Sequence, residues 1–523
     1  MKGINMKTLI TSAVFALGLL AASGWQETSA AEKTEDFGIK AAYVDFRTEV
    51  RTLASLKKQA ETISAMGMNA IIMEWEASFP FDRNATLCNR YSFTADEVRE
   101  FVAYCRELGI DVIPLQNCLG HSEYILRHER YHALREDPKD PSQVCPLKAD
   151  EAEPVFREIF REVAALHPSK YFHIGADETY LLGKCRECGE FVREHGKSKL
   201  FVDYVNRMCR LVLDMGKIPV MWADIILAYP EAIDSLPEEV ILVDWNYGWD
   251  VNHFGELQNI YDSCVEIWGA TSLRSYPDNI YLTQWMKHFT NLATFVPYAR
   301  AHGYKGMIET SWSTSGIYGF HFDNENEIMN MQPVRLVYPE SGFRILNAAA
   351  AKAFNMEEPL DPKEFIYDYA ASRFGFDETQ AGILWDYFSM PQETVSSRTG
   401  EDSEGRKIAD VLSDAKNMRD KLLTLHPKDN KEEIRHLQLM LDIRINYLEY
   451  KLIETIYESS AYDRSRAAAL AEDLDRVCRE GKKLDRRFAS LNKGYLKPGE
   501  IEYICFKRGE KMNSLLEILD NNR

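Results

Sequence analysis

Short runs of consecutive apolar residues alternate along the chain with segments whose apolar residues recur every three or four positions. The runs lie at 41–44, 70–73, 112–115, 171–172, 219–222, 241–244, 264–267 and 306–309. Such runs are typical of strands buried on both faces of a parallel sheet. The segments between them show helical spacing, as in Val98, Phe101, Val102 and Cys105. Eight strands that alternate with helices, followed by a helix at 334–354, predict an α/β fold, the (β/α)8 TIM barrel.

Strand patterns stop after about residue 359. Helical stripes follow at 408–415 and 434–452, and a third helix is expected at 464–483. We therefore predict a (β/α)8 barrel domain at 31–358 and an all-helical C-terminal domain at 359–523, folded as antiparallel hairpins. No strict heptad runs for long, which favours an intramolecular core over a coiled-coil dimer seam. The oligomeric state stays open.

The first thirty residues have the pattern of a secretory signal peptide. Lys2 and Lys7 precede a mostly apolar run at 9–20, and small residues dominate 21–31. A retained membrane anchor is the alternative, but the apolar run is short for a bilayer span. We predict cleavage of 1–30 and an exported protein, periplasmic or secreted, without a membrane span.

The formal net charge of −19 argues against partners that are nucleic acids or anionic membrane surfaces. Nine tryptophans within an aromatic content of 11% suit a carbohydrate binder, because sugar faces stack on indole rings. They suit a large hydrophobic core equally well, so only the positions of these residues can distinguish sugar binding from core packing.

The most informative stretch is His173–Thr179, in which a buried strand runs directly into the adjacent carboxylates Asp177 and Glu178. Charge at the end of a buried strand is costly unless something uses it. In a β/α barrel the carboxyl ends of the strands form the active-site face. A solvated turn is the alternative. The combination of His173 and Gly175 with the carboxylate pair is rare, however, and it favours a functional site.

Aromatic residues follow several other strands. The expected strand ends carry Trp222, Trp245, Trp268 and Trp312, and polar groups at such ends include Glu74, His121, Asp224, Tyr247 and Glu309. A single Trp of this kind would more often be packing. Four at matching positions beside a carboxylate pair predict an aromatic-walled pocket with polar specificity groups.

Four of the ten cysteines leave a question open. Cys185 and Cys188 form a single CxxC motif, and Cys118 and Cys145 lie in the loop before the carboxylate strand. One CxxC without a second pair or a His partner is weak support for zinc. A disulfide or metal clip among the four is not excluded, but we expect neither metal nor cofactor.

The string His173–Glu178 resembles the His-x-Gly-x-Asp-Glu signature of glycoside hydrolase family 20, the β-N-acetylhexosaminidases. The runs at 73–81 and 113–121 look like the hexosaminidase D branch of that family, and the tryptophans at 222, 245 and 312 continue the match. The resemblance covers roughly 41–312. One departure is that Phe37, rather than Arg, precedes Gly38 near the first strand, so hydroxyl recognition must differ; Asp45 and Arg47 lie nearby.

The resemblance implies substrate-assisted catalysis, an exception to the usual use of two separated carboxylates. The 2-acetamido oxygen of the sugar would attack the anomeric carbon and form an oxazolinium. Glu178 would be the general acid and base, Asp177 would orient the acetamido N–H, and Tyr247 would bond the acetamido oxygen. The expected substrate-binding residues are Asp45, Glu74, His121, His173, Trp222, Asp224, Trp245, Trp268 and Trp312.

We therefore expect an exo-acting, retaining β-N-acetylhexosaminidase that releases terminal β-linked GlcNAc or GalNAc from a glycan or glycoconjugate. One alternative is a barrel glycosidase with a carboxylate nucleophile, with Glu74 and Glu309 as candidates. Another is a non-catalytic glycan-binding protein that keeps the pocket. Sugar preference, linkage and the role of the helical tail stay open.

Overall fold

The computed structural model describes residues 36–314, 318–322, 329–333 and 335–522 of the 523. The expected signal peptide, 1–30, lies outside the described residues. From Glu35 onward the chain forms one compact unit. Within the described ranges, no helix is long and apolar enough to cross a membrane.

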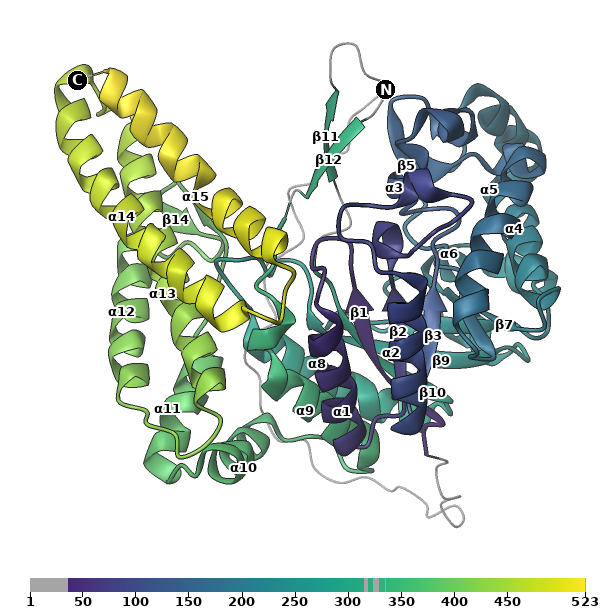
Figure 1. The fold of residues 1–523 in the computed structure, drawn as a ribbon, viewed down its shortest axis with the longest axis horizontal. Helices are drawn as coiled ribbons and strands as arrows, with labels where there is room; N and C mark the ends of the chain where they lie inside the picture. The colour runs from purple at the N-terminus through teal and green to yellow at the C-terminus, as the bar shows by residue number, and fades with distance from the viewer. Residues whose placement is uncertain (1–35, 315–317, 323–328, 334, 523) are drawn as a thin grey trace, which may run out of the picture. The chain divides into compact units, whose positions relative to one another are not determined.

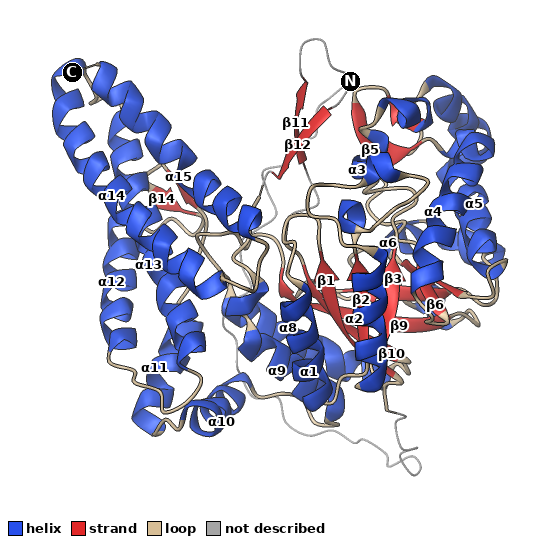
Figure 2. Ribbon diagram, viewed as in Figure 1, coloured by secondary structure: helices blue, strands red, loops and turns tan. Residues whose placement is uncertain are grey.

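Eight parallel strands close into a barrel, as the apolar runs predicted (Figure 2). They are β1 Ile39–Asp45, β2 Ala70–Glu74, β3 Asp111–Leu115, β6 Tyr171–His173, β7 Ile218–Trp222, β8 Ile241–Trp245, β9 Glu266–Arg274 and β10 Gly306–Ser311. The strand order around the barrel is β1-β10-β9-β8-β7-β6-β3-β2. Because all strands run the same way, their carboxyl ends meet at one rim and bring distant residues together.

The strand that carries Trp268 does not end there, as the sequence suggested, but continues to Arg274. Apart from Leu273, the β9 residues after Trp268 are small or polar, so they lack a run of apolar residues. They are nevertheless buried and pair with β10. Trp268 lies opposite Gly306, the first residue of β10, and its ring meets Tyr171, the first residue of β6, at 5.0 Å. It therefore fills the amino-terminal end of the barrel, away from the carboxyl rim.

Helices surround the barrel, as Figure 1 shows. They are α1 Leu53–Ala65, α2 Ala95–Glu107, α4 Ala149–Leu166, α5 Arg186–Leu213, α8 Trp285–Ala301 and α9 Arg344–Asn355, with the short helices α3 Glu123–Leu126, α6 Asp224–Ala228 and α7 Gln258–Tyr261. Thr94 and Glu97 form a capping box at the start of α2. The helix expected from residue 334 begins only at Arg344, because the residue before Pro339 is pushed out of helical backbone; Val334 itself is not described.

Other short elements lie in the connections between the barrel strands and in the helical region that follows. The 3-10 helices are η1 Glu76–Ser78, η2 Ala85–Leu87, η3 Glu129–Leu134, η4 Pro146–Lys148, η5 Pro230–Ser235, η6 Glu340–Gly342 and η7 Arg464–Arg466. Antiparallel strand pairs are β4 Arg135–Asp137 with β5 Asp140–Val144, β11 Tyr318–Phe322 with β12 Met329–Pro333, and β13 Val395–Ser396 with β14 Glu401–Asp402. The β4–β5 pair belongs to the long connection from β3 to β6.

The chain after the barrel is helical, as predicted. Its helices are α10 Pro362–Phe374, α11 Glu378–Ser389, α12 Ile408–Leu423, α13 Lys431–Tyr457, α14 Ala467–Asn492 and α15 Pro498–Asn521. In Figure 1, α12 to α15 lie side by side as successive antiparallel helices. One hydrophobic core runs from the barrel helices into α10–α13, so the boundary at 358/359 stays a prediction.

Candidate active site

The turn after β6 places two carboxylates at the carboxyl rim. Gly175, Ala176 and Glu178 all have positive φ, at 70°, 72° and 49°. A Cβ on Gly175 would lie 2.0 Å from the side-chain oxygen of Asn117, so only glycine fits there. Non-glycine residues at positive φ cost free energy and cluster at functional sites. The strained turn projects Asp177 and Glu178 from the strand end into a cavity.

That cavity has a volume of about 300 Å³. Its lining residues are Arg47, His121, Asp177, Glu178, Tyr180, Trp222, Trp245, Tyr247, Trp249, His253, Phe254, Ser275, Tyr276, Trp312, Thr314 and Arg335. Within the described part of the chain, Asp177 and Glu178 are the only acidic side chains in this lining. Aromatic rings make up most of the remaining wall.

His121 bridges the two carboxylates. Its Nε2 lies 3.3 Å from Oδ2 of Asp177 and 3.2 Å from Oε2 of Glu178. Burial opposes protonation of the imidazole, but the neighbouring carboxylates outweigh burial and raise the pKa of His121 well above its usual value. His121 itself has a φ of 53°, so it is a further strained residue at this site, beside Ala176 and Glu178. A charged imidazolium thus sits between Asp177 and Glu178.

Glu178 is held from three sides. Its Oε1 accepts a hydrogen bond of 2.7 Å from the Tyr180 hydroxyl, and its backbone N–H donates to Oδ2 of Asp224 at 3.0 Å. Burial would raise the pKa of Glu178, but the bond and charge of His121, together with Tyr180, lower it below the usual value. The free site therefore favours the Glu178 carboxylate.

Asp177 keeps one acceptor unused. Its Oδ1 is buried and has no hydrogen-bond partner among the described residues, while Oδ2 faces His121. A buried carboxylate oxygen without a partner is costly, so it marks a place where a ligand N–H can bind. Asp224 lies behind the pair, and burial together with the charge of Asp177 raises its pKa to about 7.

Tyr247 and Trp312 form a hydrogen-bonded pair in the aromatic wall. The indole Nε1 of Trp312 donates to the Tyr247 hydroxyl at 3.0 Å. The Tyr247 hydroxyl, which also interacts with the side chain of Thr310, lines the cavity and can bond a ligand there. Trp222 packs between Trp312 and His173, with ring centroids 6.1 and 4.6 Å away.

A second aromatic group comes from the segment after β8. Trp245 contacts Tyr247, Trp249 and Phe254 at centroid distances of 5.1, 5.3 and 4.4 Å. These rings, with the Trp222 and Trp312 pair, form a continuous apolar surface that can stack on a sugar ring.

Five of the nine expected binding residues do not line the cavity: Asp45, Glu74, His173, Asp224 and Trp268. Asp45 accepts hydrogen bonds from Arg47 and from the backbone and hydroxyl of Ser313. Glu74 accepts bonds of 2.8 Å from Tyr43 and from Asn117. Arg47 lies between these carboxylates, lines the cavity and has its guanidinium 4.9 Å from the Trp312 ring centroid. Asp45 and Glu74 thus position Arg47.

His173 is a neutral packing group. Its Nδ1 accepts from the Gly175 N–H at 3.0 Å, and burial lowers its pKa to about 3. Trp268 lies at the opposite end of the barrel, as described above. Asp224 touches the site through the backbone of Glu178 and is not part of the cavity lining.

The sequence analysis did not predict several residues that line the cavity, because these residues lie in loops. They are Tyr180, Trp249, His253, Phe254, Ser275, Tyr276, Thr314 and Arg335. The aromatic density of 245–254 was a signal for Trp249 and Phe254. Ser275 and Tyr276 follow the true end of β9, so the misplaced strand end concealed them.

A separate group of side chains has the composition of a metal site. Among the described residues, Glu136, Cys145, Cys185 and Cys188 gather with their ligand atoms within 4.8 Å of one another. None of the four lines the aromatic cavity. Cys118, one of the four cysteines singled out from the sequence, is not part of this group.

A closed (β/α)8 barrel with a carboxylate pair in an aromatic cavity at the carboxyl rim defines a barrel glycosidase. Residues 44–331, more than half of the chain, match the model of glycosyl hydrolase family 20, catalytic domain. The chain belongs to glycoside hydrolase family 20, as the motif at 173–178 indicated.

The chain is also similar to two proteins named hexosaminidase D and to one solved β-N-acetylhexosaminidase. Hexosaminidase D of Bos taurus is 27% identical over 265 residues, which cover 47% of this chain and 76% of the relative. Hexosaminidase D of Homo sapiens is 26% identical over 253 residues, covering 46% of this chain and 51% of the relative. The β-N-acetylhexosaminidase of Bacteroides fragilis NCTC 9343 gives a TM-score of 0.49 at 18% identity, over 68% of this chain and 71% of that one.

Proposed function

We propose that this glycosidase is an exo-acting, retaining β-N-acetylhexosaminidase in which the acetamido oxygen of the substrate is the nucleophile. The observation that carries the proposal is the adjacent pair Asp177 and Glu178, the only acidic groups in the described lining of the cavity. A carboxylate nucleophile would need a second carboxyl group about 5–5.5 Å from the acid, across the scissile bond.

The alternative nucleophiles are both unsuitable in position. Glu74 is bonded to Tyr43 and Asn117 and does not line the cavity. Glu309 is fully buried, accepts a hydrogen bond from Thr271, and has a pKa that burial raises to about 8. A protonated, buried Glu309 is a poor nucleophile near neutral pH. Among the described residues, neither of these two alternative carboxylates lines the cavity, which supports a nucleophile supplied by the substrate.

The remaining groups fit the two ends of an acetamide. Asp177 offers its unpartnered Oδ1 to the acetamido N–H, and Tyr247 offers its hydroxyl proton to the acetamido oxygen. Together they would hold the oxygen against the anomeric carbon and balance the positive charge of the oxazolinium. Glu178 would protonate the departing oxygen and then deprotonate water.

The charge of His121 must be reconciled with an acid at Glu178. In the free site the imidazolium favours the Glu178 carboxylate. A bound sugar excludes water from the pair, and this desolvation raises the pKa of Glu178 towards the protonated state that leaving-group departure needs. Asp177 lies 3.3 Å from the same imidazole and would face the positive charge of the oxazolinium.

The size and lining of the cavity support a terminal sugar as the ligand. A volume of about 300 Å³ is at the lower end for ligand pockets and suits a single ring. The aromatic wall would stack on the apolar face of that ring, and Arg47 would bond its hydroxyls. The relatives named hexosaminidase D support an N-acetylhexosamine, either GlcNAc or GalNAc, at the end of a glycan.

Hydrolysis of matched nitrophenyl glycosides tests the proposal. The protein should cleave the β-GlcNAc or β-GalNAc substrate and leave the β-galactoside and β-glucoside almost untouched, because these lack the acetamido nucleophile. Comparable rates on β-GalNAc and β-galactoside would reject substrate assistance. Binding of the amino sugars without any turnover would instead support a glycan-binding protein.

We also propose that the protein is exported and that residues 1–30 are removed. The basic start, the short apolar run and the small residues before residue 31 support this location. Expression of the full gene followed by mass analysis of the exported protein should show a chain beginning near residue 31. Recovery of the intact chain from the membrane fraction would favour a retained anchor.

A further inference from the structure

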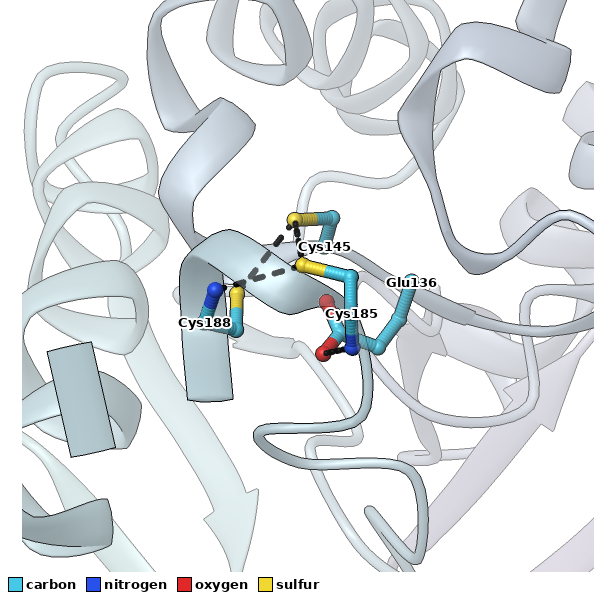
Figure 3. A group of neighbouring side chains, drawn as sticks. All are labelled: Glu136, Cys145, Cys185 and Cys188. Carbon is cyan, nitrogen blue, oxygen red and sulfur yellow. Dashed lines mark hydrogen bonds between the residues drawn. The ribbon is translucent and has the colours of Figure 1, made fainter. Parts of the chain in front are cut away.

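Three cysteines and one glutamate converge beside the β4–β5 strand pair, as Figure 3 shows. Glu136 belongs to β4, Cys145 follows β5, and Cys185 and Cys188 lie at the start of α5. The Cys145 sulfur is 3.8 Å from that of Cys185 and 3.5 Å from that of Cys188. Segments up to fifty residues apart in sequence therefore present their sulfurs to one point.

Glu136 brings a buried carboxylate oxygen into this cluster. Its exposed fraction is 1%, and its Oε1 accepts the Cys185 backbone N–H at 2.8 Å. Its Oε2 is buried with no hydrogen-bond partner among the described residues. A buried carboxylate oxygen without a donor is strongly disfavoured, and thiols are weak donors. A cation at this position would satisfy the oxygen.

We propose that Glu136, Cys145, Cys185 and Cys188 bind one Zn²⁺ ion as a structural site. Three thiolates and one carboxylate form a complete four-coordinate set for this metal, with no position left for water or substrate. Tetrahedral Zn–S bonds of about 2.3 Å place sulfurs about 3.8 Å apart, close to the spacings seen here. Little movement is needed for the ion to enter.

The local backbone supports thiolate ligands. The Cys188 N–H points to the Cys185 sulfur at 3.3 Å, and Cys185 caps the start of α5. Hydrogen bonds from backbone N–H groups and a helix amino terminus both stabilise negative sulfur. Cys145 and Cys188 are almost fully buried, which protects a bound ion from solvent.

The four ligands come together only in the folded chain, which is why the sequence analysis predicted no metal site. The CxxC motif supplies only two ligands, and Cys118, which looked like a candidate, is not part of the cluster. Cys145 and Glu136 reach the site only when the β4–β5 pair packs against α5. A disulfide between two of the three cysteines would leave the Glu136 oxygen unsatisfied, so the full set favours the metal.

The site would connect the active-site loops. The segment between Glu178 and Cys185 carries Tyr180, which bonds Glu178, and the Leu181 N–H donates to the Gln143 side chain of β5 at 2.9 Å. The Ser122 N–H, next to His121, donates to the Ser142 carbonyl at 3.1 Å. The ion would therefore anchor the segment that carries Tyr180 and the strand pair that supports His121.

Metal analysis of the purified full-length chain tests the proposal directly. We expect about one equivalent of zinc, either as isolated or after incubation with Zn²⁺ and removal of excess. Replacement by Co²⁺ should give the visible bands of a tetrahedral site and a sulfur-to-cobalt charge-transfer absorption. Absence of stoichiometric binding under both conditions would overturn the proposal, as would a disulfide among these cysteines in the non-reduced, alkylated protein.

Matched variants assign the ligands. Cys188→Ser and Glu136→Gln should each lower zinc affinity by at least about tenfold, whereas Cys264→Ser, an exposed cysteine outside the cluster, should not. Glu136→Gln keeps the side-chain shape, so its loss of metal is readable even if the cysteine variant folds poorly. Unchanged zinc affinity in Glu136→Gln would remove the carboxylate from the site. In the parent, a chelator should lower the melting temperature.

Discussion

At the scale of single residues, the site consists of two carboxyl groups and an imidazole in a cavity with aromatic walls. His121 lies within hydrogen-bond range of both Asp177 and Glu178; the carboxylates raise the pKa of His121, and His121 helps to lower the pKa of Glu178. Removing one group therefore changes the chemistry of its neighbours, and kinetic effects of these residues should not be additive.

Glu178→Gln should lower turnover of substrates with poor leaving groups by about 10²–10⁴-fold, the range of general acid catalysis. Aryl glycosides with acidic phenols should lose less, because their leaving group needs little protonation. The measurement is kcat/KM on the two substrate types, with Glu151→Gln on the exposed face of α4 as control. An equal loss on both types would reject Glu178 as the acid.

Asp177→Asn and Tyr247→Phe should each weaken a thiazoline inhibitor by about tenfold to a hundredfold while changing product binding less. The inhibitor resembles the cyclised intermediate that these groups stabilise. Inhibition constants for the thiazoline and for the free sugar measure the difference. A fluorinated sugar that traps carboxylate nucleophiles should leave no adduct; an adduct on Glu74 or Glu309 would end the substrate-assisted mechanism.

His121→Asn should move the alkaline limb of the kcat/KM–pH profile to higher pH. In the parent, the imidazolium helps hold the pKa of Glu178 below its usual value, so the acid form is lost early as pH rises. Removing the positive charge raises that pKa and extends the acid form upward in pH, although the maximal rate falls. His195→Asn, at an exposed position, should leave the profile in place. A limb that stays fixed or moves down would contradict this coupling.

At the scale of elements, buried ion pairs join the barrel to the helices that follow it. Arg51, before α1, bonds Glu340 of η6 at 2.5 Å and Glu49 at 3.0 Å. Arg274, the last residue of β9, also meets Glu49 and lies 3.9 Å from Glu340. All four side chains are almost fully buried. The network locks the end of β9 against the segment that begins α9.

Glu340→Gln should destabilise the fold by about 3–5 kcal/mol, because it leaves buried guanidinium charge uncompensated. Glu100→Gln is the matched control: its partner Lys57 is on the surface, so the change should be within about 0.5 kcal/mol. Denaturant unfolding of the three proteins gives both values.

The same network predicts a response to acid. Burial opposes the Glu340 charge, but Arg51 and Arg274 outweigh it and lower its pKa below 4.5. The ionised Glu340 carboxylate then contributes its full stabilisation of the fold above pH 4.5. This stabilisation is lost as the pH falls through the lowered pKa of Glu340. The difference in stability between the parent and Glu340→Gln should shrink in that acid range; a difference that grows there would contradict the assignment.

At the scale of the whole chain, barrel and helical region share one core. Tyr281, in the loop after β9, stacks on Tyr447 of α13 at 4.0 Å, and its hydroxyl donates to the Arg508 carbonyl of α15 at 3.1 Å. Trp285 of α8 packs on Phe388 of α11 at 5.0 Å. Such contacts make independent folding of the barrel unfavourable.

We therefore expect a single cooperative thermal transition for residues 35–523, and an insoluble or molten product from a chain that ends at residue 358. Calorimetry with and without the amino sugar product is the measurement: ligand should shift the whole transition. Two separable transitions, with only one moved by the sugar, would show that the helical region is an independent domain.

The sequence by itself determined the local features of this protein. Runs of apolar residues marked all eight strands, because strands buried on both faces need continuous apolar sequence. The strained string at 173–178 marked the carboxylate pair and the family. The sequence analysis did not predict α10, although Asp361, Pro362 and Gly375 at its two ends are residue types that favour helix caps. Arg508 interrupts the buried stripe of α15 and conceals that helix.

Only the tertiary structure decided which distant side chains meet. It placed Trp268 at the far end of the barrel, because the true length of β9 depends on pairing with β10. It put Arg47 in the cavity and Asp45 and Glu74 behind it, because hydrogen bonds across neighbouring strands orient these groups. It joined Glu136 and Cys145 to the CxxC motif. The spacing of apolar residues in the sequence indicates only which face of each helix or strand is buried. Closure of the barrel decides which strand ends lie side by side.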